Sequence, residues 1–160
     1  MIRRAACLAL VPAALLAGAP EARAQLNPGI HVARATDTFG GSNGVGGSVE
    51  LSFPVFPIDL FVAGEYFFPD CGTADECSFM GGSADVHLGL PVPVLAPYAT
   101  GGLVYRRTDT GGGAGAVAKT GWGGGVGVHL GTLVLGAYAE ARYEVVDPED
   151  QFVFRLGLRF

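Results

Sequence analysis

Large apolar side chains recur at every second position along most of this chain, with glycine, serine or charged residues between them. The segment TGWGGGVGVHL shows the pattern most plainly: Trp122 and Val126 lie on one face, and Gly123, Gly127 and His129 lie on the other. Side chains alternate between two faces in a β-strand, whereas an α-helix repeats every 3.6 residues. The chain is therefore restricted to strands with one bulky apolar face and one small or polar face.

Eight segments carry this alternation, so we predict an all-β fold. The first segment is the least regular, and we include it partly because an antiparallel sheet that closes on itself needs an even number of strands. The segments cover residues 29–36, 45–53, 60–67, 80–90, 98–106, 120–130, 133–145 and 152–160.

The composition indicates which face meets which surroundings. Charged residues make up 16% of the chain, against about 25% in soluble domains. A soluble sandwich or lipocalin-like barrel would turn the apolar face inward. Here the apolar face is bulky and the other face is small, which suits a narrow lumen filled by side chains. Strands of about 9–11 residues cross a bilayer when tilted. We predict an eight-stranded antiparallel up-and-down transmembrane β-barrel with its apolar faces in lipid.

The first 24 residues have the features of a secretory signal peptide. Arg3 and Arg4 precede an apolar run, and Ala22-Arg23-Ala24 fits the cleavage pattern. We expect residues 1–24 to be removed and residues 25–160 to form the barrel in the outer membrane. Removal takes Arg3, Arg4, Arg23 and Glu21 from totals of 10 basic and 15 acidic residues, which leaves 7 and 14. So acidic a chain is not expected to bind nucleic acid.

The inward faces hold charged residues that are costly to bury without partners. We predict that they form a network of ion pairs which plugs the lumen. The alternative is a narrow channel for small solutes whose charges select or gate ions. The predicted members are Glu50, Glu65, Asp85, Arg106, Glu140, Arg142, Glu144, Arg155 and Arg159.

Two histidines, His87 and His129, also fall on inward faces. A third hypothesis is therefore a lipid A-modifying barrel enzyme, in which a histidine acts with a serine or an acid. Ser83 and Asp85 share the face of His87, but no deacylase motif surrounds them. We expect these histidines to fill the lumen, and we predict no catalytic residues, cofactor or metal.

The predicted connections alternate in length. Long ones at 37–44, 68–78, 107–119 and 147–150 would lie outside the cell, and short ones at 54–57, 91–97 and 131–132 in the periplasm. Aromatic residues at strand ends would then form girdles at the membrane surfaces. The outer girdle would consist of Tyr66, Tyr105, Trp122, Tyr143 and Phe152, and the inner one would include Phe53 and Phe160.

Cys71 and Cys77 are the two cysteines that follow the signal peptide, and in an exported protein such a pair indicates a disulfide. Two cysteines at this spacing with no nearby histidine do not make a zinc site. The bridge would pin the acidic loop 68–78. This loop and loop 107–119 are candidates for binding an extracellular ligand.

Residues 121–160, from GWGGGVGV through EARYEV to FVFRLGLRF, resemble the closing strands of OmpA-like small outer-membrane barrel proteins. The resemblance implies contact with outer-membrane lipid and lipopolysaccharide. It also implies that Phe160 is part of the signal read by the outer-membrane assembly machinery. The function expected from the residues and the resemblance together is that of a structural or surface-interaction protein without catalysis.

Overall fold

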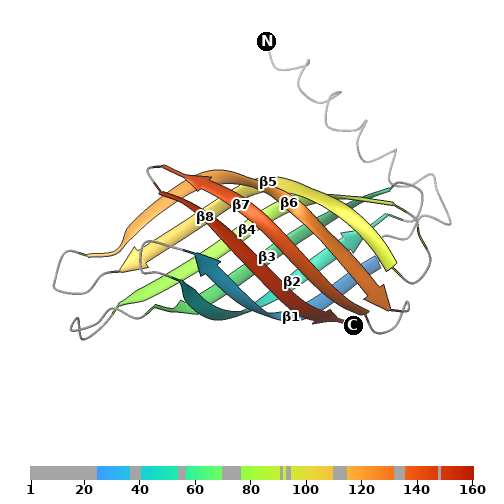
Figure 1. Ribbon diagram of the computed structural model, residues 1–160, viewed down its shortest axis with the longest axis horizontal. Helices are drawn as coiled ribbons and strands as arrows, with labels where there is room; N and C mark the ends of the chain where they lie inside the picture. Colours follow the sequence, from blue (N-terminus) through green and yellow to red (C-terminus); the bar gives the residue numbers. More distant parts are fainter. Residues whose placement is uncertain are drawn as a thin grey trace, which may run out of the picture.

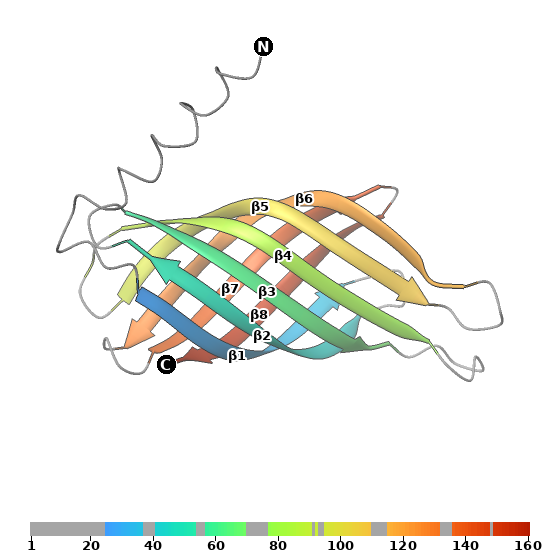
Figure 2. The same ribbon diagram turned by 180° about the vertical axis from the view of Figure 1, so that it is seen from behind.

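The computed structural model describes residues 25–36, 41–53, 57–69, 77–90, 92, 95–109, 115–131, 136–147 and 149–160. These residues form eight antiparallel strands, each paired with the next, and β1 pairs with β8 to close a barrel (Figures 1 and 2). The all-β, up-and-down architecture predicted from the sequence is confirmed. The strands are β1 Gln25–Thr36, β2 Ser42–Ser52, β3 Ile58–Phe68, β4 Ser78–Gly89, β5 Leu95–Asp109, β6 Val117–Gly131, β7 Gly136–Val146 and β8 Glu149–Arg159.

The strands are tilted against the long axis of the barrel, and odd and even strands run in opposite directions (Figure 1). We call the end where β1 finishes the Thr36 end and the end where β8 finishes the Phe160 end. The connections predicted to be long leave from the Thr36 end, because β1, β3, β5 and β7 all finish there. Among the described residues, no helix is long and apolar enough to span a membrane.

The exposed and buried faces follow the predicted alternation. Along β3, Phe61 and Glu65 are buried, whereas Val62 and Tyr66 are exposed. The bulky apolar residues therefore cover the outside of the barrel. Trp122, Val126 and Leu156 show 60%, 64% and 61% exposure, which is the reverse of the arrangement in a soluble domain.

The strands extend beyond the predicted bounds. Residues 107–109 and 117–119 were predicted to lie in a loop, but Arg107 pairs with Ala118 and Thr108 with Val117. In the same way, residues 42–44 belong to β2, 95–97 to β5 and 149–150 to β8. Backbone pairing continues past the last bulky apolar residue, so the apolar pattern alone underestimates the length of these strands.

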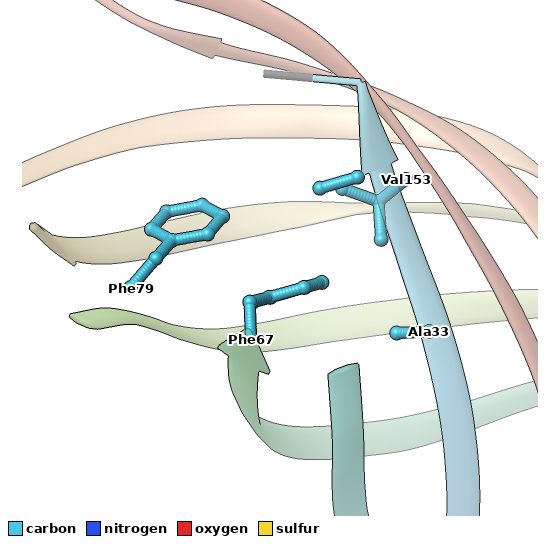
Figure 3. Close-up of a cluster of buried hydrophobic side chains, with 5 residues drawn as sticks. Ala33, Phe67, Phe79 and Val153 are labelled. Atoms are coloured by element: carbon cyan, nitrogen blue, oxygen red, sulfur yellow. The ribbon is translucent and has the colours of Figure 1, made fainter. Parts of the chain in front are cut away.

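The lumen contains more than the small and charged residues expected there. A cluster of Ala33, Ala35, Phe67, Phe79 and Val153 fills it near the Thr36 end (Figure 3). The rings of Phe67 and Phe79 stack with centroids 4.7 Å apart. A second cluster, formed by Phe61, Ala63 and Tyr138, lies closer to the Phe160 end.

Glycines on the inward faces make room for these rings. A Cβ atom at Gly127 of β6 would overlap the ring of Tyr98 on β5, and a Cβ at Gly157 of β8 would overlap the ring of Tyr138 on β7. Each glycine therefore accommodates an aromatic side chain from the neighbouring strand. The other inward glycines of β6, Gly121, Gly123 and Gly125, lie instead against backbone or side-chain atoms of β7.

Candidate functional site

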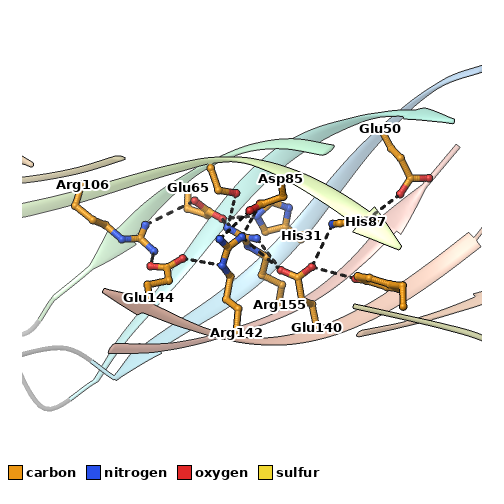
Figure 4. A network of polar contacts seen from close by, with 12 residues as sticks. His31, Glu50, Glu65, Asp85, His87, Arg106, Glu140, Arg142, Glu144 and Arg155 are labelled. Atoms are coloured by element: carbon orange, nitrogen blue, oxygen red, sulfur yellow. Dashed lines mark hydrogen bonds and ion pairs between the residues drawn. The ribbon is translucent and has the colours of Figure 1, made fainter. Parts of the chain in front are cut away.

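All nine residues predicted for the lumen charge network project toward the barrel axis. They come from six strands, β2, β3, β4, β5, β7 and β8. Figure 4 labels all of them except Arg159, together with His31 and His87. Eight of the nine are buried, and Arg159 retains 26% side-chain exposure. The alternation of each strand is sufficient to place them there.

Arg142 of β7 makes a two-pronged contact with Asp85 of β4. Its Nη1 donates to Asp85 Oδ2 at 2.6 Å, and its Nη2 donates to Asp85 Oδ1 at 3.0 Å. The Nε atom lies 3.0 Å from Glu144 Oε1. A bidentate arginine–carboxylate pair of this kind is strong and directional, and it joins β7 to β4.

Arg155 of β8 lies between two other carboxylates. Its Nη1 donates to Glu140 Oε1 at 2.7 Å, and its Nε donates to Glu65 Oε1 at 2.6 Å. Its Nη2 donates to the hydroxyl of Ser83 at 3.2 Å. Ser83, which was considered as a catalytic partner of His87, therefore serves as an acceptor for Arg155.

Arg106 of β5 extends the network toward the Thr36 end. It forms an ion pair with Glu144, and its Nη1 lies 3.9 Å from Glu65 Oε2. Its guanidinium carbon lies 5.3 Å from the ring centroid of Phe79 and 5.7 Å from that of Phe67. Cation–π contacts over such distances link the charged layer to the apolar cluster.

The Phe160 end of the network holds Glu50, Arg159 and two histidines. Glu50 Oε1 accepts hydrogen bonds from Arg159 and from Ser52. Glu50 Oε2 lies 3.6 Å from His87 Nδ1 and 3.7 Å from His129 Nε2. Both histidines are inward, as predicted.

Aromatic rings pack around His87. Its imidazole stacks between Phe61 and Tyr98, with centroid distances of 4.6 Å and 4.4 Å. The Tyr98 hydroxyl donates to Glu140 Oε2 at 3.1 Å. These contacts fix the height and orientation of the His87 ring.

His31 is a lumenal residue that sequence reasoning missed. It is buried, and its Nε2 lies 3.5 Å from Glu65 Oε1. It lies on β1, where the alternation was least regular. The inward position of His31 follows from the alternation of this strand, since every second residue from Gly29 to Ala35 is buried.

The residues of the proposed girdles are exposed on the outside of the barrel, except Phe53, which is half-buried. Tyr143 and Phe152 are direct cross-strand partners with ring centroids 5.0 Å apart. Tyr66 packs edge-to-face on Phe68 at 5.3 Å. The exposed fractions are 42% for Tyr66, 45% for Tyr105, 60% for Trp122, 37% for Tyr143, 51% for Phe152 and 55% for Phe160.

Two predictions concern residues outside the described ranges. The signal peptide covers residues 1–24, and Cys71 lies in the gap between 69 and 77. Both the signal peptide and the Cys71–Cys77 disulfide therefore stay predictions.

The sequence matches no protein-family model and no curated protein. The fold matches solved structures over most of its length. The N-terminal β-barrel domain of Pseudomonas aeruginosa OprF aligns with a TM-score of 0.61 and 17% identity, over 86% of this chain and 100% of that one. The attachment invasion locus protein Ail of Yersinia pestis aligns with a TM-score of 0.60 and 14% identity, over 88% and 99%.

A third match is Neisserial surface protein A, with a TM-score of 0.59 and 15% identity over 86% of this chain and 97% of that one. At sequence identities this low, the comparisons show a similarity of fold alone. Closure of the eight described strands and the outward apolar faces agree with it. The chain therefore has the fold of the OmpA-like small outer-membrane barrels.

Proposed function

We propose that this protein is a structural or surface-interaction barrel of the outer membrane, with a lumen closed by ion pairs and no catalytic activity. Its outer surface supports the membrane location, because large apolar side chains on every strand face outward. A closed barrel leaves no unpaired sheet edge, which is the condition for a sheet to lie in hydrocarbon. The structural neighbours are outer-membrane barrels as well.

The main support for a closed lumen is the position of two arginines. Arg142 and Arg155 have side chains with 0% exposure, and each contacts carboxylates from other strands. Arg155 joins β8 to β3 and β7, and Arg142 joins β7 to β4. These pairs span the lumen between strands, which supports a passage closed to solutes.

Planar-bilayer recording tests the closed lumen. The purified protein is expected to give no steady open events, and the matched control Arg107→Ala, at an exposed position on β5, should behave in the same way. Steady open events in the wild type that disappear when Glu140 or Arg155 is neutralised would contradict the proposal. They would favour the narrow channel instead.

Incubation with lipopolysaccharide followed by mass analysis tests the absence of catalysis. We expect the acyl count of lipid A to stay constant. An altered count that depends on His87 or His129 would favour the lipid A-modifying enzyme. The position of His87 between Glu50 and Glu140, stacked on two aromatic rings, supports a role inside the lumen rather than access to a lipid substrate.

The surface role rests on loops 68–78 and 107–119 as candidates for ligand binding. One similar structure, Ail, was solved with the heparin analogue sucrose octasulfate. Loop 68–78 of this chain has three acidic residues and no basic ones, Asp70, Asp75 and Glu76. Its charge favours a cationic ligand or divalent cations of the lipopolysaccharide layer, rather than a sulfated sugar.

Surface-plasmon resonance on the barrel in nanodiscs checks the ligand class. We expect a basic peptide to bind and a sulfated oligosaccharide not to bind. The control variant carries Asp70→Asn, Asp75→Asn and Glu76→Gln, which should abolish the binding of the peptide. Binding of the oligosaccharide with equal strength to both proteins would contradict an acidic recognition loop.

A further inference from the structure

Three chemically reactive side chains meet at the Phe160 end of the lumen. Glu50, His87 and His129 each stand two residues before the end of their strands, β2, β4 and β6. These strands run in the same direction and alternate with odd strands around the barrel, so the three residues reach similar heights. Among the described residues, this is the one group of three or more potential metal ligands with atoms within 4.8 Å of one another.

The distances within this group fit a metal ion. Zn²⁺ binds histidine nitrogen at about 2.0–2.1 Å and carboxylate oxygen at about 2.0–2.2 Å, so ligand atoms of a tetrahedral site lie about 3.3–3.4 Å apart. Glu50 Oε2 lies 3.6 Å from His87 Nδ1 and 3.7 Å from His129 Nε2. A shift of a few tenths of an ångström in the side chains closes the difference for these two pairs, and all three ligand atoms lie within 4.8 Å of one another.

The second observation is the state of the His87 nitrogens. The residue is 1% exposed, and neither ring nitrogen makes a hydrogen bond within the described part of the chain. A buried polar atom without a partner costs about 1–3 kcal/mol. Its Nδ1 faces the carboxylate of Glu50 at a distance too long for a hydrogen bond and right for a shared ion.

The residues behind the group form the supports that metal sites require. His87 Nε2 lies 3.6 Å from Glu140 Oε2, the carboxylate that accepts from Tyr98. Glu50 Oε1 is occupied by Arg159, which leaves Oε2 for the ion. A ligating histidine whose other nitrogen faces a carboxylate is the common second-shell arrangement at zinc sites.

We propose that Glu50 Oε2, His87 Nδ1 and His129 Nε2 bind one Zn²⁺ ion, with water in the fourth position. Two imidazoles and one carboxylate favour zinc and similar transition metals over Ca²⁺ and Mg²⁺, which take oxygen ligands. His129 and Arg159 are the partly exposed residues here, with 12% and 26% side-chain exposure, so the ion enters from the Phe160 end. The bound ion cross-links β2, β4 and β6 across the lumen.

Cobalt titration tests the site. The full chain, purified in detergent without a polyhistidine tag and treated with a chelator, is titrated with Co²⁺ and followed by visible absorption. We expect one Co²⁺ per chain with a tetrahedral spectrum, displaced by one Zn²⁺. His129→Asn should weaken binding by more than about tenfold, since even second-shell changes cost about 10–100-fold in affinity.

The matched control is His31→Asn, because His31 is also a buried lumenal histidine beside a carboxylate but contacts Glu65 instead. It should bind Co²⁺ as the wild type does. A wild type that takes up no Co²⁺, or equal affinity in His129→Asn, would overturn the proposal. X-ray absorption of the Zn²⁺-loaded wild type gives a readout that needs no variant: two imidazole ligands support the site, and their absence refutes it.

Discussion

Arg142 of β7 reaches across the lumen to Asp85 of β4 and makes two hydrogen bonds, with Nη1–Oδ2 at 2.6 Å and Nη2–Oδ1 at 3.0 Å. The two residues are 57 positions apart in the sequence, and their strands are not neighbours in the barrel. The pair therefore ties opposite parts of the wall together through the interior.

Breaking this pair on one side should destabilise the barrel strongly. Arg142→Gln leaves the buried carboxylate of Asp85 without its partner, and we expect a loss of about 3–5 kcal/mol in the free energy of unfolding. The double variant with Asp85→Asn should lose less than the two single losses added together. Urea unfolding in lipid vesicles measures all three variants, and strictly additive losses would contradict a direct coupling.

The lipid-facing surface can be tested with a charge on β6. Val126 is 64% exposed near the middle of the strand, so Val126→Arg should cost about 2–4 kcal/mol if it faces the bilayer midplane. The control is Val117→Arg at the first residue of the same strand, where a cost of about 0–1 kcal/mol is expected. Equal costs at both positions, measured by refolding into lipid, would argue against a depth-dependent hydrocarbon environment.

Glycines that face the lumen should tolerate substitution by alanine less well than glycines on the outer face of the barrel. Gly127→Ala places a Cβ in the ring of Tyr98, which cannot move away easily because it stacks on His87 and donates to Glu140. Overpacking of this kind costs about 1–3 kcal/mol. At Gly124 on the outer face, the nearest atom to an added Cβ is Thr100 O at 3.4 Å. Gly124→Ala should therefore be close to neutral in the same unfolding assay.

Phe160 should matter more for assembly than for stability. Its backbone N donates to Pro28 O at 3.0 Å, an interaction that any residue keeps, and its ring is exposed. Phe160→Ala should lower the folded fraction in the outer membrane, seen as heat-modifiable mobility on gels, and leave refolding in detergent unchanged. Phe154→Ala, at another outward position of β8, is the control. A normal folded fraction for Phe160→Ala in cells would contradict the signal role.

The sequence was sufficient to predict which residues of each strand face the lumen. It was insufficient to predict which of them form ion pairs with one another. Period-two alternation places Glu140 and Arg155 inside whatever the register, because successive side chains must point to opposite faces. That Arg142 meets Asp85 depends on strand tilt and on the stagger around the closed sheet, which no local pattern encodes. The histidine–glutamate group was missed for the same reason, since its members come from β2, β4 and β6.

The sequence predicted which residues face the lumen better than it predicted the types of side chain that fill it. Phe61 and Phe67 lie on the expected inward faces, but we predicted a lumen of small and charged residues. Gly44 on the neighbouring strand gives the Phe67 ring its space. A glycine next to an aromatic residue on the adjacent strand would have been the signal, and it can be recognised only when the register is known.

The seam between β1 and β8 has a consequence for biogenesis. The first and last strands pair along most of their length, from Gly29 with Arg159 to Thr36 with Phe152. Until that seam forms, both strands have free backbone groups that hydrocarbon cannot satisfy, at several kcal/mol for each. β1 and β8 must therefore either pair before the chain leaves water or pair temporarily with a strand of another protein at the membrane surface.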